Sequence, residues 1–435
     1  MLNVAVSTLG CRANQLESSI LEEELENNGF NMVEVGKQAD IIIINSCTVT
    51  QKSDSKSRYA IRQAKRLNPE AKIIVTGCYA QTAPDEIASI DGVFLVAGNA
   101  EKQELVNILL EISNNSEYKK IMVSDIKEEN SFRDKKVISA SGRTRATIKV
   151  QDGCNFCCSY CIIPQARGKS RSNSLENIIE QVKFVINKGY QEIVLSGIHL
   201  GQWGVDLKPK NELNGLLKEL EKIKELKRLR LSSIDPLELS ENLVETIINS
   251  EKICKHLHIS LQSADNDILK AMNRRYTVEK YSDIIYKLHD NIPELAIGSD
   301  IITGFPGETE DQFINTYKNL EILPISYLHV FTYSDRKNTP ASKMSGKISH
   351  EVKKQRTTEL NKLAKIKNLE FRRRFLDSEL EILVEYARDK STGMLKGLSS
   401  NYIPVLIEGT DELKNNLVVA RINHVYDNLT IGELV

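Results

Sequence analysis

Residues 154–161 read CNFCCSYC, so four of the chain's eight cysteines lie within eight positions. Cys154, Cys158 and Cys161 have the spacing C-x-x-x-C-x-x-C, and Cys157 stands beside them. A segment this dense in thiols predicts metal or redox chemistry. The same letters also contain two abutting C-x-x-C pairs, which could form a zinc or ferredoxin-type site. Structural zinc motifs, however, usually place a longer stretch between their pairs.

Three further cysteines lie upstream, and each follows an apolar run that predicts a strand. Cys11 follows VAVSTLG, Cys47 follows IIIINS, and Cys78 follows KIIVTG. Expected strands are Leu2–Val6, Ile41–Ile44 and Lys72–Val75, with helices at Gln15–Asn28 and Ser53–Leu67. This alternation predicts a parallel α/β domain, in which the carboxyl ends of the strands share one edge. The three thiols could then meet around an iron–sulfur, Cu(I) or zinc site, or they could be ordinary core cysteines.

Downstream of the cysteine cluster, strands and helices alternate again. Expected strands are Thr147–Val150, Glu192–Leu195, Arg228–Leu231, His256–Leu261, Ile297–Ile302 and Tyr327–Thr332. Expected helices include Ser174–Lys188, Ser240–Asn249 and Thr309–Leu323. Six strand–helix units predict a parallel sheet curled into a partial (β/α)6 barrel, with its ligands at the carboxyl ends of the strands. The polar residues 113–142 predict a linker.

Residues 352–435 combine a basic helix with short β patterns. The helix is expected at Val352–Phe375 and carries Lys353, Lys354, Arg356, Lys362, Lys365, Lys367 and Arg372–Arg374. The β patterns lie at Leu380–Tyr386, Tyr402–Ile407, Leu417–Ile422 and Leu429–Leu434, and Gly393, Gly397 and Gly409 are expected in turns. A small β-barrel after a basic helix favours a surface that binds RNA, although a solvated helix would look the same.

Composition limits the partners and the location of the chain. The net charge of -1 creates no global attraction to nucleic acid, so a local basic surface has to hold any such partner. No apolar run reaches about 18 residues, which excludes a spanning helix. The start MLNVAVSTLG lacks the regions of a signal peptide, and we therefore expect a cytoplasmic protein with no membrane partner.

Motifs along nearly the whole chain resemble those of the methylthiotransferases, a family of radical S-adenosylmethionine enzymes. The segments that carry the resemblance are TLGCRANQLES, NSCTVT, VTGCYAQ, RTRATIKVQDGCNFCCSYCIIPQARGKSRS, EIVLSGIHLGQWG, DIITGFPGETE and LKGLSSNYIPV. The RANQ after Cys11 is most similar to the branch that modifies threonylcarbamoyladenosine in tRNA. The resemblance implies a methylthiotransferase domain at residues 1–113, a radical S-adenosylmethionine core at 140–370 and a TRAM RNA-binding domain at 371–435.

The resemblance also implies cofactors and site residues. Cys154, Cys158 and Cys161 would hold one 4Fe-4S cluster with an iron left open for S-adenosylmethionine, and Cys11, Cys47 and Cys78 would hold a second cluster. Cys157 is then a bystander, and Cys254 is core or surface. Candidate contacts to S-adenosylmethionine are Tyr160, Ser196, Gly197 and Gln262. Each also has a plain structural interpretation, as a packing tyrosine, a turn or a solvated strand end.

The implied reaction adds a methylthio group to C2 of N6-threonylcarbamoyladenosine beside the anticodon, in the anticodon stem-loop of tRNA. An electron donor and a sulfur source would be further partners. The substrate carries a carboxylate, and candidates for a positive group that binds it are Arg167, Lys169, Arg171 and Arg336. Alternatives are methylthiolation of isopentenyladenosine or of a ribosomal-protein aspartate, and a non-enzymatic RNA-binding protein with a structural metal site.

The sequence departs from the family pattern in the segment HLHISLQSADND. Ser260 replaces a usual proline, and Ala264 replaces a usual glycine. If that turn needs a positive φ, Ala264 is strained, and the contacts to S-adenosylmethionine there are affected.

Overall fold

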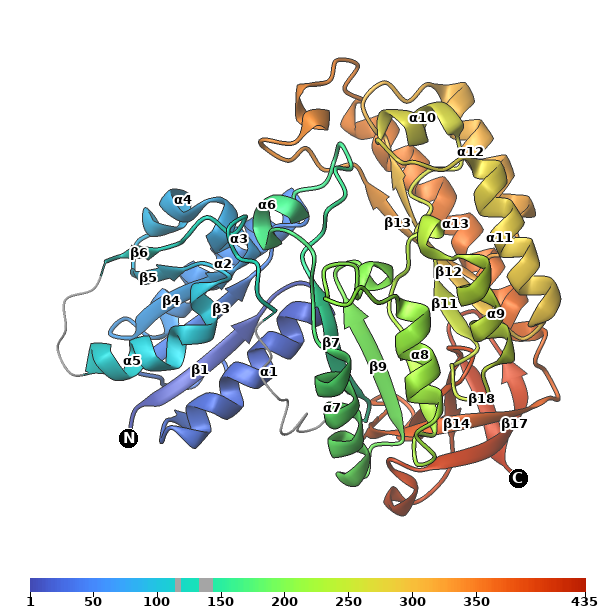
Figure 1. Ribbon diagram of the computed structural model, residues 1–435, viewed down its shortest axis with the longest axis horizontal. Helices are drawn as coiled ribbons and strands as arrows, with labels where there is room; N and C mark the ends of the chain where they lie inside the picture. The colour runs from blue at the N-terminus through green and yellow to red at the C-terminus, as the bar shows by residue number, and fades with distance from the viewer. Residues whose placement is uncertain (114–118, 133–143) are drawn as a thin grey trace. The chain divides into compact units, whose positions relative to one another are not determined.

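The computed structural model describes residues 1–113, 119–132 and 144–435. The chain divides into two compact units (Figure 1). Unit 1 holds the described residues of Met1–Ser139 together with Gln151–Asn173 and Ser334–Ser342. Unit 2 holds the described residues of Ala140–Val150 together with Ser174–Tyr333 and Lys343–Val435. The cysteine segment 154–161 therefore packs with the N-terminal sheet.

Unit 1 is built on a six-stranded parallel sheet in the order β2-β1-β3-β4-β5-β6. Its strands are β1 Asn3–Thr8, β2 Asn31–Met32, β3 Ile41–Ser46, β4 Lys72–Gly77, β5 Val93–Ala97 and β6 Ile121–Met122. The predicted strands correspond to β1, β3 and β4. β6 lies in the stretch predicted as linker and pairs with β5. Residues 114–118 and 133–142 of that stretch fall outside the described residues.

Helices cover both faces of this sheet, because successive strand residues point to opposite sides. Ile41 and Ile43 pack with α1 and α5, and Ile42 and Ile44 pack with α2, α3 and α4. The helices are α1 Arg12–Asn27, α2 Gln51–Leu67, α3 Cys78–Thr82, α4 Pro84–Ala88 and α5 Leu105–Ser113. A parallel sheet buried on both faces explains the continuous apolar run at 41–44.

Unit 2 contains the six parallel strands of a partial barrel. These are β7 Ala146–Asp152, β9 Glu192–Gly197, β10 Arg228–Leu231, β11 His256–His258, β12 Ala296–Thr303 and β13 Tyr327–Thr332. The sheets are ordered β10-β9-β7-β8 and β11-β12-β13, and the parallel bridges Leu229–Ile253 and Ile234–Ile259 join them. The last two residues of β7, Gln151 and Asp152, belong to unit 1, and they pair antiparallel there with β8, Arg171–Ser172. The predicted α/β class with a partial barrel is confirmed.

Four helices of the partial barrel, α7, α9, α11 and α12, begin at hydroxyl caps that the sequence makes recognisable. Ser174, Ser240 and Thr277 each accept a hydrogen bond from the backbone N–H three residues on, and Thr309 forms a capping box with Gln312. The helices are α7 Leu175–Asn187, α8 Leu213–Glu221, α9 Glu241–Asn249, α10 Asn266–Ala271, α11 Val278–Asn291 and α12 Glu310–Ile322; α6, Ile163–Arg167, belongs to unit 1.

The C-terminal part of unit 2 is a closed barrel in the order β14-β15-β16-β18-β17. Its strands are β14 Glu379–Arg388, β15 Leu395–Ser399, β16 Pro404–Ile407, β17 Leu417–Val425 and β18 Thr430–Leu434. The predicted small β-barrel is confirmed, but the expected turn at Gly397 is wrong, because this glycine lies in β15. A Cβ there would sit 3.0 Å from Cδ1 of Ile382, so the close approach of β14 accounts for the glycine.

The basic helix is α13, His350–Arg373, and its cations do not form one solvated face. Arg356 is buried and lies 2.6 Å from Glu308. Buried Lys367 donates to the carbonyls of Glu321 and Leu323. These cations hold the helix against its own unit. No helix in the described residues is long and apolar enough to cross a membrane.

Candidate active site

Cys11, Cys47 and Cys78 meet at the carboxyl edge of the unit 1 sheet. They follow the adjacent parallel strands β1, β3 and β4. Burial raises the pKa of the Cys78 thiol, and the charge of Cys11 raises it further. The pKa of Cys47 is likewise raised by burial, with added contributions from Cys78 and Cys11. A cation close to these thiols would favour their thiolate forms, and three soft donors at one sheet edge fit a metal or iron–sulfur cluster.

Two glycines allow this convergence. Gly10 has a φ of 95°, and a Cβ there would lie 2.6 Å from Sγ of Cys47. Gly77 has a φ of 94°, and a Cβ there would lie 2.4 Å from the carbonyl oxygen of Ser46. Both positions combine a left-handed backbone with a close approach, so only glycine fits without displacing the neighbouring cysteine loop.

Asparagines fix the loops that carry these thiols. Asn14 donates to the carbonyls of Leu9 and Ser46, at 2.9 and 3.0 Å. Asn45 donates to the carbonyl of Asn14 and to Oγ of Ser18. The sequence assigned neither residue a role, although Asn14 lies in the RANQ motif and each stands within three positions of a predicted cysteine ligand. Their buried hydrogen bonds determine where the cysteines point.

The segment CNFCCSYC forms a tight loop in the same unit. Cys161 donates its backbone N–H to the carbonyl of Cys158, and Cys154 donates to the carbonyl of Gly168, both at 3.0 Å. Cys154, Cys158 and Cys161 are half-buried, whereas Cys157 is exposed. This difference in burial agrees with the prediction that Cys157 is a bystander. Cys254 is buried in unit 2, and burial raises its pKa to about 12, as expected for a core thiol.

The two cysteine groups lie on elements that pack together, since α3 begins at Cys78 and packs against α6, which follows Cys161. Asn99 donates to the carbonyl of Ala166 at 2.7 Å, and its amide lies 3.9 Å from Sγ of Cys78. Unit 1 therefore carries both predicted cluster sites.

Three of the four cations predicted to bind substrate are buried in ion pairs. Arg167 is 2% exposed and contacts Glu17 at 2.7 Å and Asp152 at 3.1 Å. Arg171 contacts Asp152 at 3.5 Å, and Arg336 contacts Asp54 at 2.7 Å. Of these four described residues, Lys169 is the exposed one. The sequence could not show this, because the acidic partners of Arg167 and Arg336 lie 15–282 positions away along the chain.

Arg167 also acts on the thiols. Burial alone would lower its pKa, but Glu17, Cys78 and Asp152 raise it well above the usual value, so the guanidinium stays protonated. In return its charge lowers the pKa of Cys78. It also donates to Oδ1 of Asn14 at 2.7 Å. Arg167 thus connects the loop after Cys161 to the helix after Cys11.

Of the predicted contacts to S-adenosylmethionine, three lie at strand ends of unit 2. Ser196 is buried near the end of β9, and Gly197 ends that strand. Gln262 follows β11 and pairs with Ile301 of β12. Tyr160 lies in unit 1 between Cys158 and Cys161. Whether these residues bind the cofactor stays a prediction.

The strain expected at Ala264 is found at Gln262 instead. Gln262 has a φ of 71°, whereas Ala264 is buried with an ordinary backbone. Two hydrogen bonds to β12, each 2.8 Å long, hold the backbone of Gln262. Its N–H donates to the carbonyl of Asp300, and its carbonyl accepts from the N–H of Ile302. These two bonds offset the cost of the left-handed conformation, which is about 1–3 kcal/mol.

Family models and known relatives agree with this arrangement. The model described as "Radical SAM superfamily" matches residues 148–320, and "Uncharacterized protein family UPF0004" matches 3–98. In fold, the chain is similar to the radical S-adenosylmethionine methyltransferase TsrM of Kitasatospora setae. That similarity has a TM-score of 0.60, 13% identity, and coverage of 78% of this chain and 76% of that one.

Curated relatives extend over nearly the whole chain. The threonylcarbamoyladenosine tRNA methylthiotransferases MtaB of Aquifex aeolicus and Bacillus subtilis are 42% and 39% identical, over 95% and 97% of this chain and 98% and 94% of theirs. A tRNA-2-methylthio-N(6)-dimethylallyladenosine synthase of Protochlamydia amoebophila is 32% identical over 99% of this chain and 95% of its own length. The predicted family resemblance is confirmed, and the chain belongs to the threonylcarbamoyladenosine tRNA methylthiotransferase family.

Proposed function

We propose that this chain converts N6-threonylcarbamoyladenosine beside the anticodon of tRNA to its 2-methylthio derivative by radical S-adenosylmethionine chemistry. The observation that carries the proposal is the convergence of Cys11, Cys47 and Cys78 at one sheet edge, in the same unit as the C-x-x-x-C-x-x-C loop. One three-thiol site suits radical chemistry, and a second suits sulfur transfer.

The cofactors are two 4Fe-4S clusters and S-adenosylmethionine. Cys154, Cys158 and Cys161 would hold one cluster, and the three sheet-edge cysteines would hold the other. When bound, these groups supply the electron and radical chemistry that an unreactive C2–H bond requires, which acid–base side chains cannot supply. Each three-cysteine set leaves one iron without a protein thiolate.

The chain's own residues position the reaction. Arg167, with its bonds to Asn14 and Glu17, holds the two cysteine-bearing segments in register. Ser196 and Gly197 at the end of β9, and Gln262 after β11, are proposed to bind S-adenosylmethionine, with Tyr160 beside the adenine. Barrel strand ends are where α/β enzymes place such contacts.

The proposed partner is the anticodon stem-loop, bound by the C-terminal barrel and the exposed cations of α13. A separate electron donor and a sulfur source complete the reaction, which we place in the cytoplasm. Lys169 is proposed as the cation that meets the substrate carboxylate, since Arg167, Arg171 and Arg336 already contact acidic side chains.

The test is turnover of the anaerobically reconstituted enzyme on two anticodon stem-loops, one with threonylcarbamoyladenosine and one with isopentenyladenosine. Mass spectrometry of the nucleosides should find the 2-methylthio product on the first. A site that pairs with a carboxylate and a hydroxyl discriminates strongly against an apolar analogue, because its polar groups would be left unpaired. Equal rates, or preference for the isopentenyl substrate, would contradict the assignment and favour the activity named for the Protochlamydia relative.

A further inference from the structure

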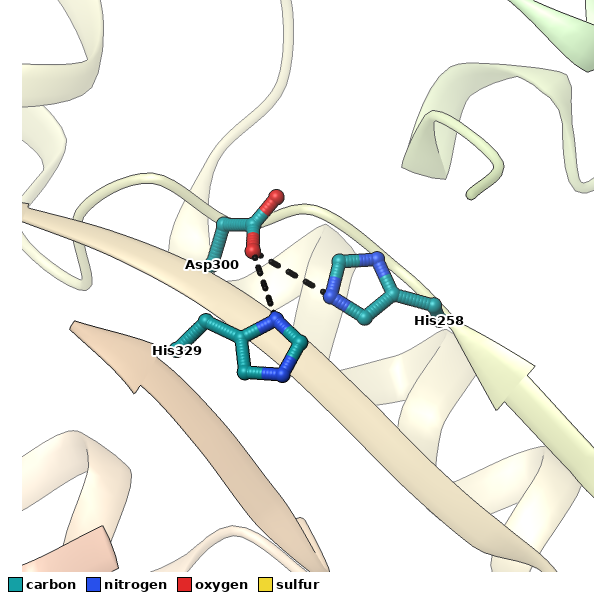
Figure 2. Close-up of side chains that lie close together, drawn as sticks. All are labelled: His258, Asp300 and His329. Carbon is teal, nitrogen blue, oxygen red and sulfur yellow. Dashed lines mark ion pairs between the residues drawn. The ribbon is translucent and has the colours of Figure 1, made fainter. Parts of the chain in front are cut away.

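Three side chains that the proposed reaction does not use meet on one face of the second sheet of unit 2. His258 ends β11, Asp300 lies in β12, and His329 lies in β13, on three adjacent parallel strands (Figure 2). The alternate residues of these strands, such as Leu257 and Ile301, belong to the apolar core. The three polar residues therefore share the opposite face of the sheet.

Both imidazoles point at the same carboxylate oxygen. Nε2 of His258 lies 3.2 Å from Oδ1 of Asp300, and Nδ1 of His329 lies 3.3 Å from that oxygen. All three ligand atoms lie within 4.8 Å of one another. Ligands bound at 2.0–2.1 Å around a tetrahedral ion are about 3.3–3.4 Å apart, so the two nitrogen–oxygen separations are close to those of a metal site.

Hydrogen bonds do not account for one of the buried nitrogens in this arrangement. His258 is 7% exposed, and its buried Nε2 makes no hydrogen bond to any described residue despite facing Asp300. The other nitrogen, Nδ1, lies 2.9 Å from Oγ of Ser233. When Nδ1 carries the proton and donates to Ser233, the lone pair of Nε2 faces a carboxylate oxygen. A cation in contact with both atoms removes that repulsion, and the serine is the outer partner that orients a metal-binding histidine.

The geometry leaves one oxygen of the carboxylate available as a ligand. Oδ2 of Asp300 accepts a hydrogen bond from Oγ of Ser260 at 3.4 Å, and Oδ1 faces the two imidazoles. The neighbouring His256 differs, because its Nε2 lies 2.8 Å from the hydroxyl of Tyr327 and its ring stacks on Tyr402. Because its Nε2 and its ring already contact other side chains, His256 is not proposed as a ligand.

We infer that His258, Asp300 and His329 bind a divalent transition-metal ion of the zinc class, separate from the iron–sulfur clusters. Two imidazoles and one carboxylate are a donor set for Zn²⁺, Fe²⁺ or Ni²⁺ and not for Mg²⁺ or Ca²⁺. Three protein ligands leave a fourth position of a tetrahedral ion open for water or for an anionic group. The site lies wholly within unit 2 and does not depend on the proposed function.

The experiment uses full-length protein with both clusters assembled under anaerobic conditions, so that the six ligand cysteines are occupied. The protein is dialysed against chelator-buffered Zn²⁺, and bound zinc is counted by mass spectrometry. We expect one equivalent, with an X-ray absorption spectrum fitted by nitrogen and oxygen at about 2.0 Å and no sulfur at about 2.3 Å.

Variants assign the ion to the three residues. His329→Gln and Asp300→Asn should each weaken zinc binding at least tenfold, whereas His350→Gln, at an exposed histidine of α13, should leave it unchanged. His329 is half-exposed, so its variant should fold, and circular dichroism checks this. No bound zinc, a sulfur shell, or unchanged zinc in both variants would overturn the inference. The 2-methylthio product formed by the same samples is measured separately, so failure of the zinc inference and failure of the proposed function can be told apart.

Discussion

Arg167 and Lys169 stand two positions apart and have opposite surroundings. The guanidinium of Arg167 is buried between Glu17 and Asp152, and the side chain of Lys169 is exposed. Both were predicted to bind substrate, because a sequence shows the charge of a residue and not its burial. We therefore propose Arg167 as a positioning residue and keep Lys169 as the proposed contact to the substrate.

Replacing each residue separates these roles. Arg167→Met removes the buried cation between Glu17 and Asp152, which keep Lys102 and Arg171 as their remaining partners. We expect a loss of about 1.5–3 kcal/mol in folding free energy together with poor cluster assembly. Lys169→Met should keep the melting temperature and iron content while raising KM for the stem-loop. A stable Arg167→Met protein that lost only turnover would show instead that Arg167 contacts the substrate.

Cys157 and Cys158 provide a second test at this scale. Cys157 is exposed, and Cys158 is half-buried in the loop that Cys161 closes. Cys157→Ala should therefore keep about eight irons per chain and full cleavage of S-adenosylmethionine, whereas Cys158→Ala should abolish cleavage and lose about half of the iron. Iron analysis and detection of 5′-deoxyadenosine give both readouts. The reverse pattern would exchange the two assignments.

At the scale of elements, α13 is both a structural helix and a candidate RNA surface. Lys362, Lys365 and Arg373 are exposed and lie within about 100° of the helix circumference. Arg372 is buried and donates to the carbonyls of Tyr426 and Leu429. The basic composition alone did not distinguish these two sets.

Changing the three exposed residues to Gln should lower the salt slope of tRNA binding by up to about 0.7–0.9 for each phosphate that the helix no longer neutralises. The melting temperature should not change. Arg372→Gln is the control, and it should lower the melting temperature while leaving the slope unaltered. Binding measured at several salt concentrations decides the matter, and an unaffected slope in the triple variant would place the RNA surface elsewhere.

Strands were predictable where an apolar run is bounded by polar residues, as at β3 and β4, and where apolar residues alternate with polar ones, as at β10. β15 was missed because Gly397 resembles a turn residue, and its role depends on Ile382, a distant residue of β14. The two-residue strands β2 and β6 have too few residues for a periodic signal. The positions of the predicted cysteine ligands could be inferred from the sequence, because the carboxyl ends of parallel strands lie at one edge of the sheet. The partners of Arg167 and the group around Asp300 could not be inferred, because residues far apart in the sequence form them only in the folded chain.

At the scale of the molecule, the partial barrel and the C-terminal barrel form one unit. Arg230 is fully buried, pairs with Glu192 at 2.6 Å, and donates to the carbonyls of Ser399 and Ser400. Tyr402 stacks on His256 with ring centroids 4.1 Å apart. Because buried groups of one barrel are satisfied by the other, the two should unfold together.

Tyr402→Leu tests this coupling. Removal of the aromatic stack and of the contact with Arg230 should cost about 1–2 kcal/mol and lower the melting temperature of unit 2 by about 2–8 °C. The exposed Tyr386 provides the matched control, and Tyr386→Leu should change little. Hydrogen exchange should show β11 and β16 losing protection together in the Tyr402 variant. A decrease in protection confined to β16 would mean that the barrels are independent.

The junction of β10 with β11 has a mechanical consequence. In the part of the chain that the structure describes, the two isolated bridges at Leu229 and Ile234 join these strands, whereas β12 and β13 pair over six positions. Four register pairs join β9 to β10 and three join β11 to β12, so the wall of the barrel is more compliant between β10 and β11 than at either neighbouring strand pair. Slow changes in curvature would be taken up at that junction, and the strands carrying His258, Asp300 and His329 would move as a single plate.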